Sequence, residues 1–327
     1  MSIPFFPAIV HLTEVGPRDG FQNENQILPT ALKLRLIEGL VEAGLKTIQV
    51  ASFVNPRKVP QMADSEEIVR LLPKRDGVLF TGLALNVRGM ERALDCGISG
   101  IEVSVSASHT HSLRNAGMGR QEALEEVKTM IRMAGRRPDV QLRASIQCAF
   151  GCPGEPAPEL DILLDMAEAL LQEGVGMICL ADTTGMADPM AIERTIGGFR
   201  KHFGDRPIVL HLHDTRGLGL VNAYAALQMG IRHFDTSFGG IGGCPFVEGA
   251  AGNIATEDTL ALLESLDIRS GVDPRRVALC SWELADFLKK PLPGRMYRLY
   301  REHWERRKQG EEGAGAAGPS TRCEFPV

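Results

Sequence analysis

Two histidines stand one residue apart in the stretch HLHDTRG, residues 211 to 217, of a 327-residue chain that has eight histidines. Alternate side chains of a strand share a face, so His211 and His213 should point the same way. Two converging imidazoles make half of a site for a divalent metal ion. A hydrogen-bonded pair of histidines on a sheet would have the same spacing. The spacing alone leaves both interpretations open.

A turn near the start of the chain carries two charged residues that could complete such a site. In EVGPRDGFQNE, residues 14 to 24, the glycines and the proline predict a tight turn that fixes Arg18 and Asp19. Asp19 would supply an oxygen ligand, and Arg18 a permanent positive charge. The same turn could instead be a charged surface loop with an internal Arg–Asp pair.

The glycine-rich stretch GGIGGCPFVEGAAGN, residues 239 to 253, has the composition of a mobile active-site loop. Its Cys244 would have a lowered pKa beside cations and a metal, and could then act as an acid or base. The alternative for Cys244 is a small apolar side chain under a loop. Asn253 could cap the next helix or give a carbonyl oxygen to a metal.

Several other polar residues carry weaker signals. Asp182, in LADTTG, could be a base, a partner of a histidine or a helix cap. Cys148 and Cys152 have no second pair to complete a zinc site, so a structural role is expected. His109 and His111 form a second alternating pair in a polar loop, where a substrate-facing or plain surface position is expected.

These residues need a scaffold that brings distant segments together, and the apolar patterning supplies one. Short β-branched runs alternate with helical patterns that end at glycines such as Gly44 and Gly135. The predicted strands are 11–15, 47–51, 78–85, 101–106, 141–149, 177–182, 208–214 and 233–238. Eight strand–helix units predict a (β/α)8 TIM barrel, whose active site lies where the strands end. A doubly wound open sheet is the alternative, but GPRDGFQNE lacks its glycine fingerprint.

The C-terminal part of the chain continues past the eighth predicted strand. Helical patterns cover 256–266, 274–289 and 294–307. We therefore predict a catalytic barrel domain over residues 1–270 and a C-terminal helical extension over 271–307. The small-residue segment 308–327 should be a flexible tail.

The overall composition narrows the class of protein. A net charge of −5 and no dominant basic face argue against a nucleic-acid or anionic-membrane partner. There is no apolar run long enough to span a bilayer, and the N-terminus lacks the features of a signal peptide. Seven widely spaced cysteines do not form a disulfide framework. We expect reduced thiols and a cytoplasmic location.

Five stretches together resemble the hydroxymethylglutaryl-CoA lyase family, a branch of the DRE-TIM metallolyases. They are EVGPRDGFQNE, SFVNPRKVPQM, CAFGCP, HLHDTRG and GGIGGCPFVEGAAGNIATEDTL, and they lie between residues 14 and 260. The histidine motif is shared by the wider superfamily, whereas the Cys-Pro loop is more specific. Related synthases have a G-E-R-A-G-N type of loop instead, so the loop here favours a lyase.

The resemblance implies a Mg or Mn ion held by an aspartate, two histidines and an asparagine, which here are Asp19, His211, His213 and Asn253. It also implies that Arg18 stabilises an enolate and that Cys244 is the catalytic loop cysteine. Asp182 matches a family acid that takes part in catalysis. An acyl-CoA substrate and a homodimer are further implications.

Two residues depart from the family pattern. The family usually has a glutamate at the end of the second strand, where this chain has Gln49, which keeps the shape but cannot act as a base. The family also tends to have an aromatic residue where this chain has Arg216. That arginine could bind a carboxylate or a CoA phosphate, or could be a solvated surface residue. Both are candidate substrate-binding residues, together with Arg18.

The leading hypothesis is a metal-dependent lyase that cleaves 3-hydroxy-3-methylglutaryl-CoA to acetyl-CoA and acetoacetate in a retro-Claisen step. The same chemistry on a different 3-hydroxy-acyl-CoA with a distal carboxylate is the first alternative, motivated by Gln49 and Arg216. A Claisen-type condensing synthase is the second. A metal- or CoA-binding barrel that has lost its activity through Gln49 is the third.

Overall fold

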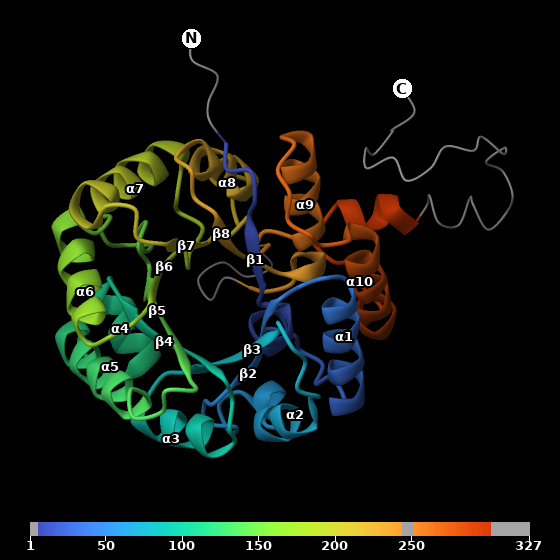
Figure 1. Ribbon diagram of the computed structural model, residues 1–327, viewed down its shortest axis with the longest axis horizontal. Coiled ribbons are helices and arrows are strands. Elements are labelled where there is room, and N and C mark those ends of the chain that lie inside the picture. The colour runs from blue at the N-terminus through green and yellow to red at the C-terminus, as the bar shows by residue number, and fades with distance from the viewer. Residues whose placement is uncertain (1–5, 244–250, 302–327) are drawn as a thin grey trace, which may run out of the picture.

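A computed structural model describes residues 6–243 and 251–301 of the chain. Eight parallel strands form a closed barrel in sequence order, with the helices outside it (Figure 1). The strands are β1 His11–Glu14, β2 Thr47–Ser52, β3 Leu79–Ala84, β4 Gly100–Ser106, β5 Gln141–Gln147, β6 Met177–Ala181, β7 Ile208–His211 and β8 His233–Thr236. The predicted TIM barrel is confirmed. Pairing of β1 with β8 rules out the open doubly wound sheet.

The outer helices turn an apolar stripe toward the barrel. In the first of them, Leu32, Leu36 and Leu40 recur at four-residue intervals and are buried. Local signals set several helix starts, as where the Asp188 carboxylate accepts a 2.8 Å hydrogen bond from the amide of Ala191. The barrel helices are α1 Thr30–Glu42, α2 Ser65–Leu71, α3 Val87–Asp95, α4 His109–Ala116, α5 Arg120–Ala134, α6 Leu160–Gln172, α7 Pro189–Phe203, α8 Gly219–Gln228 and α9 Thr256–Ser265.

The C-terminal region packs beside the first strand–helix unit. Helix α9 follows β8 and is the last of the barrel helices, and α10 (Pro274–Leu288) lies against α1 and α9 (Figure 1). A Cβ atom at Gly39 of α1 would lie 2.7 Å from the Sγ atom of Cys280, so glycine permits this close approach. Residues 296–301 are helical, within the predicted 294–307 segment. The predicted tail over 308–327 lies outside the described residues.

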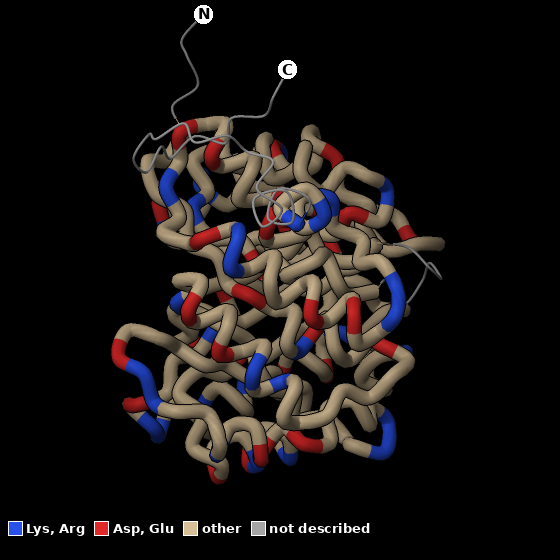
Figure 2. The backbone as a smooth tube through the Cα atoms, turned by 90° about the vertical axis from the view of Figure 1, so that its right-hand side faces the viewer, with Lys and Arg blue, Asp and Glu red and all other residues tan. Residues whose placement is uncertain are grey.

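Basic and acidic positions are interspersed along the backbone tube on the side of the molecule that Figure 2 shows. Within residues 6–243 and 251–301, no helix combines the length and the apolar character needed to cross a bilayer.

Candidate active site

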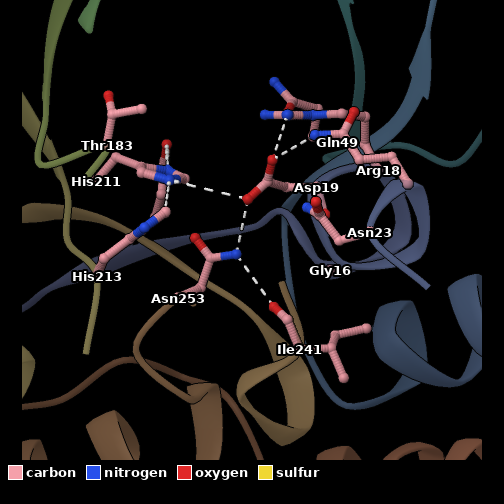
Figure 3. A network of polar contacts seen from close by, with 12 residues as sticks. Gly16, Arg18, Asp19, Asn23, Gln49, Thr183, His211, His213, Ile241 and Asn253 are labelled. Carbon is pink, nitrogen blue, oxygen red and sulfur yellow. Dashed lines mark hydrogen bonds and ion pairs between the residues drawn. The ribbon is translucent and has the colours of Figure 1, made fainter. Parts of the chain in front are cut away.

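The two histidines and the aspartate of the sequence motifs meet at the mouth of the barrel (Figure 3). The Nε2 atoms of His211 and His213 lie 3.2 Å apart, and the Nε2 atom of His211 lies 4.0 Å from the Oδ2 atom of Asp19. One ligand atom from each of the three residues falls within 4.8 Å of the others. These three residues could therefore hold one metal ion. All three are largely shielded from solvent.

A buried carboxyl group holds the turn that carries Arg18 and Asp19. The Oε1 atom of Glu14 accepts hydrogen bonds from the amides of Gly16, at 2.8 Å, and Phe238, at 3.0 Å. The hydroxyl of Thr256 lies 2.6 Å from the other oxygen. Burial raises the pKa of Glu14 to about 8, so the group is largely protonated at neutral pH. Glu14 thus ties the turn after β1 to the segments that follow β8.

Asn253 joins the cluster from the far side of the glycine-rich loop. Its Nδ2 atom donates hydrogen bonds to the Oδ2 atom of Asp19, at 2.8 Å, and to the carbonyl of Ile241, at 3.1 Å. Its Oδ1 atom is buried and has no partner among the described residues. The backbones of Asn253 and His213 also form an antiparallel bridge. Asn253, the predicted fourth ligand, therefore lies beside Asp19 and has an amide oxygen that a cation could bind.

The electrostatics of the cluster suit a cation. Burial, together with the neighbouring His211, lowers the pKa of His213 to about 3, so His213 is a neutral imidazole. Burial also disfavours charge on His211, but the hydrogen bond that it donates to Asp235 and the negative charges of Asp235 and Asp19 outweigh this effect and raise the pKa of His211. Burial would raise the pKa of Asp19, yet the charges of Arg18 and His211 lower it. An anionic carboxylate and the neutral imidazole of His213 are thus available as ligands, while Asp235 orients His211.

Below the cluster, four side chains form a hydrogen-bonded floor network, which we define as Gln49, Glu102, Arg143 and Asp235. The amide of Gln49 accepts from the Nε atom of Arg18 and donates to the Oε2 atom of Glu102 at 3.0 Å. Arg143 binds Glu102 through two nitrogens and reaches both oxygens of Asp235, at 2.7 and 2.9 Å. Asp235 in turn lies 3.2 Å from the Nδ1 atom of His211. The network connects Arg18 to a histidine across the barrel.

The other predicted site residues occupy different places. Gln49 is completely buried behind Arg18 and does not line the cavity at the mouth. The Nε and Nη2 atoms of Arg216 donate to the carbonyls of Gly185, at 2.7 Å, and Ala187, at 2.9 Å, so Arg216 braces the loop after β6. Cys244 lies outside the described residues.

Asp182 lies at the end of β6, next to the cavity but not among its lining residues. Its Oδ1 atom accepts a 3.0 Å hydrogen bond from the amide of Ala187, while its Oδ2 atom is buried without a partner among the described residues. Burial raises the pKa of Asp182 to about 6. That range suits proton transfer near neutral pH, but a direct contact with a ligand would require the turn 182–187 to shift.

The cavity at the mouth has a volume of about 310 Å³ and three chemically distinct sides. One side carries Arg18 and the three clustered ligands. An aliphatic side from β2, β3 and their loops carries Val54, Val59, Leu83 and Leu85. The third side, which we name the serine wall, consists of Ser104, Ser145 and Gln147 on β4 and β5. The site therefore offers cationic, apolar and neutral polar surfaces to one ligand.

Sequence reasoning missed Glu102, Arg143 and Asp235. A signal was present, since each is a charged residue inside a short apolar strand, where a charge is rarely buried without a partner. The pairing register places Glu102 beside Arg143, which the sequence does not show.

Comparisons with known proteins place the chain in a family. The pattern that defines the HMGL-like family matches residues 9–281, most of the chain. The chain belongs to the HMGL-like family. It is similar to a hydroxymethylglutaryl-CoA lyase of Bacillus subtilis, with 36% identity over 90% of this chain and 99% of that protein. These relatives are carbon–carbon lyases.

Two further relatives carry names with other substrates. A 3-hydroxy-3-isohexenylglutaryl-CoA/hydroxymethylglutaryl-CoA lyase of Pseudomonas aeruginosa is 41% identical over 82% of this chain and 89% of its own length. An (R)-citramalyl-CoA lyase of Chloroflexus aurantiacus is 39% identical over 87% of this chain and 92% of its own length. Membership of the family therefore does not fix the acyl group.

Solved structures agree with the fold of the HMGL-like chain. A Bacillus subtilis HMG-CoA lyase superposes with a TM-score of 0.88 at 36% identity, covering 91% of this chain and all of that one. A lyase of Acinetobacter baumannii, in complex with coenzyme A and 3-methylmalate, has a TM-score of 0.85 at 33% identity, covering 90% and 96%.

Proposed function

We propose that this protein cleaves 3-hydroxy-3-methylglutaryl-CoA to acetyl-CoA and acetoacetate, with a divalent cation, Mg or Mn, at Asp19, His211, His213 and Asn253. The observation that carries the proposal is the convergence of Asp19, His211 and His213 with Arg18 on one cavity, with Asn253 hydrogen-bonded to Asp19 beside it. The unpartnered oxygen of Asn253 fits the cation, because a buried carbonyl oxygen without a donor is costly to keep. The names of the relatives support the reaction type.

In the proposed reaction, the bond between C2 and C3 of the acyl chain breaks. The proton of the C3 hydroxyl leaves to a base, for which Asp182 is the candidate, and C3 becomes the ketone of acetoacetate. The electron pair of the broken bond passes to the thioester as an enolate, which then takes a proton at C2. When bound, the cation would orient the hydroxyl and the distal carboxylate and make the hydroxyl more acidic.

The chain's own residues supply the remaining parts. Arg18 keeps one guanidinium nitrogen on Asp19, at 2.6 Å, and directs its Nε atom to Gln49, so its position at the cavity edge is fixed. A fixed positive charge at that edge would offset the negative charge that develops on the enolate oxygen. Cys244 is the proposed donor of the proton to C2. The homodimer and the cytoplasmic location remain predictions of the sequence.

The proposal is tested by following acetoacetate release from 3-hydroxy-3-methylglutaryl-CoA with added Mg, with added Mn and with chelator. We expect turnover that requires the cation and that His211→Ala and Cys244→Ala abolish. Ser270→Ala, a change well away from the cavity-lining residues, is the control and should keep wild-type turnover. A metal-bound protein that releases no acetoacetate would contradict the proposal.

A further inference from the structure

The serine wall lies across the barrel from β1, the strand that precedes the turn with Asp19. In the closed order β1 to β8, β4 and β5 stand opposite β8 and β1 (Figure 1). Ser104 of β4 pairs with Ser145 of β5, one layer above the pair of Glu102 and Arg143. Alternation along the strands turns all four side chains to the inside of the barrel. A ligand held on the side with Arg18, Asp19 and the two histidines therefore turns its other substituents toward this wall.

Two members of the wall, Ser104 and Gln147, hold hydrogen-bonding capacity that the described residues do not use, whereas the Ser145 hydroxyl hydrogen-bonds the Cys179 thiol. Ser104 is only 9% exposed, and its hydroxyl oxygen has no partner among the described residues. The Oε1 atom of Gln147 receives only a long contact of 3.5 Å from Asn115, and within the described chain its NH2 group donates to nothing. A buried hydroxyl without a partner costs free energy, so a ligand that supplies one would be favoured.

The charges around the serine wall favour a neutral ligand group over a second carboxylate. Among the described lining residues, Arg18 is the only arginine or lysine, and it lies on the cation side. Glu102 lies directly below Ser104, with its negative charge partly balanced by Arg143. Burial lowers the pKa of His111, which also lines the cavity, so this histidine adds no positive charge at neutral pH. A second carboxylate would thus find no counter-charge, whereas a hydroxyl or a ketone would find hydrogen-bond partners.

We infer that Ser104, Ser145 and Gln147 determine specificity, and that the preferred substrate carries a neutral oxygen function on the C3 branch, in place of a plain alkyl group. This inference rests on the proposed lyase function and names the acyl-CoA class that the site prefers. The aliphatic side of the cavity, with Val54 and Leu83, remains available for the methylene groups of the acyl chain. The serine wall would thus contact the C3 branch, while the side with Asp19, His211 and His213 would hold the hydroxyl and the distal carboxylate through the cation.

The test compares two CoA thioesters that differ in one atom of the branch. They are 3-hydroxy-3-(hydroxymethyl)glutaryl-CoA and 3-hydroxy-3-ethylglutaryl-CoA, measured beside 3-hydroxy-3-methylglutaryl-CoA with the Mg-loaded protein. For the wild type, kcat/KM for the hydroxymethyl compound should exceed that for the ethyl compound at least about tenfold, the value of one good hydrogen bond. Ser104→Ala combined with Ser145→Ala should bring this ratio close to one.

Ser106→Ala is the matched control, because the Ser106 hydroxyl lies on the same strand, accepts from the amide of Ser108 at 3.1 Å and does not line the cavity. It should leave the ratio unchanged. A wild-type ratio of one or less, or a ratio that the double variant does not alter, would overturn the inference while cleavage of the methyl compound still supports the lyase. If none of the three compounds were cleaved, the lyase proposal would fail. Calorimetric affinities for the two branch analogues would then decide the preference of the wall.

Discussion

The floor network and the serine wall adjoin each other on β4 and β5 but differ in how their polar groups are satisfied. Every member of the floor network has a partner, from Gln49 through Glu102 and Arg143 to Asp235. One layer above, the Ser104 hydroxyl has none among the described residues. Polar groups that are satisfied within the protein fix the geometry of their neighbours. Polar groups left unsatisfied beside a cavity mark where a ligand completes the structure.

The largest expected effect breaks the floor network at its centre. Arg143→Met leaves Glu102 and Asp235 as buried carboxylates without a counter-charge, which typically costs about 3–5 kcal/mol. The free energy of unfolding from urea titration measures this cost. Arg137→Met removes an exposed pair with Asp139 and should change stability by less than about 0.5 kcal/mol. Equal effects of the two changes would contradict the assignment of the network as structural support.

The next effect concerns the end of the network that touches His211. Asp235→Asn removes the carboxylate that lies 3.2 Å from the Nδ1 atom of His211 and that fixes its orientation. Loss of such a partner lowers metal affinity by about 10–100-fold. Competition with a fluorescent chelator measures the affinity for Mn. Asp273→Asn keeps a good helix cap at the start of α10, outside the cavity-lining residues, and serves as the control. Unchanged Mn affinity in Asp235→Asn would show that the floor network does not support metal binding.

A third, smaller effect tests the direction of the Gln49 hydrogen bonds. Gln49→Glu replaces the NH2 group that donates to Glu102 with an oxygen, so two carboxylates would face each other at about 3.0 Å. One of them would then bind a proton with a raised pKa, and stability would be lost as the pH rises. We expect a loss of about 1–2 kcal/mol at pH 8, a typical value for an unmade buried hydrogen bond, and less at pH 5.

The enzymatic activity of Gln49→Glu tests a further hypothesis. The hypothesis of a barrel that lost activity through Gln49 requires this variant to gain activity sharply. The geometry predicts no gain, because Gln49 is buried behind Arg18 and does not reach the cavity. Gln49→Met, which keeps the length but removes both hydrogen bonds, controls for packing.

The last effect belongs to Glu14 and shows as a gradual change of stability with pH. Its folded pKa is raised to about 8 from 4.5, so its protonated form is favoured in the folded state. That stabilisation is full below about pH 4.5 and is lost as the pH rises toward 8, with a slope of up to about 1.4 kcal/mol per pH unit. Glu14→Gln should flatten this part of the stability profile, as measured by urea titration between pH 5 and 8. A profile as steep as that of the wild type would show that other groups cause it.

Much of the fold follows from periodicity. The eight predicted strands all occur, and several begin or end within one residue of the prediction. The seventh was predicted to reach residue 214 but ends at His211, because the backbone of His213 pairs with Asn253 instead of the neighbouring strand. A pattern of alternating apolar residues cannot show which partner a backbone chooses. Strand positions were predictable for this reason, whereas the exact strand ends were not.

The candidate site was predictable for motif residues that lie at the carboxyl ends of the barrel strands. The convergence of Asp19 with His211 and His213 follows from their places at the ends of β1 and β7 in a closed barrel. The positions of Gln49 and Arg216 did not follow, because the direction in which a long polar side chain turns depends on the nearest partner. Arg216 finds the carbonyls of the loop after β6, and Gln49 finds Arg18.

The contact between Asn253 and Asp19 joins residues that are 234 positions apart in the chain. At the usual rate of synthesis, about 5–20 residues per second, roughly 12 to 47 seconds separate the appearance of the two side chains. For most of that interval the growing chain has Asp19 but lacks the two histidines, and until its end it lacks the asparagine, that would share a cation with Asp19. A nascent chain of this protein therefore cannot capture its ion early, and metal loading becomes a sign that the whole barrel has closed.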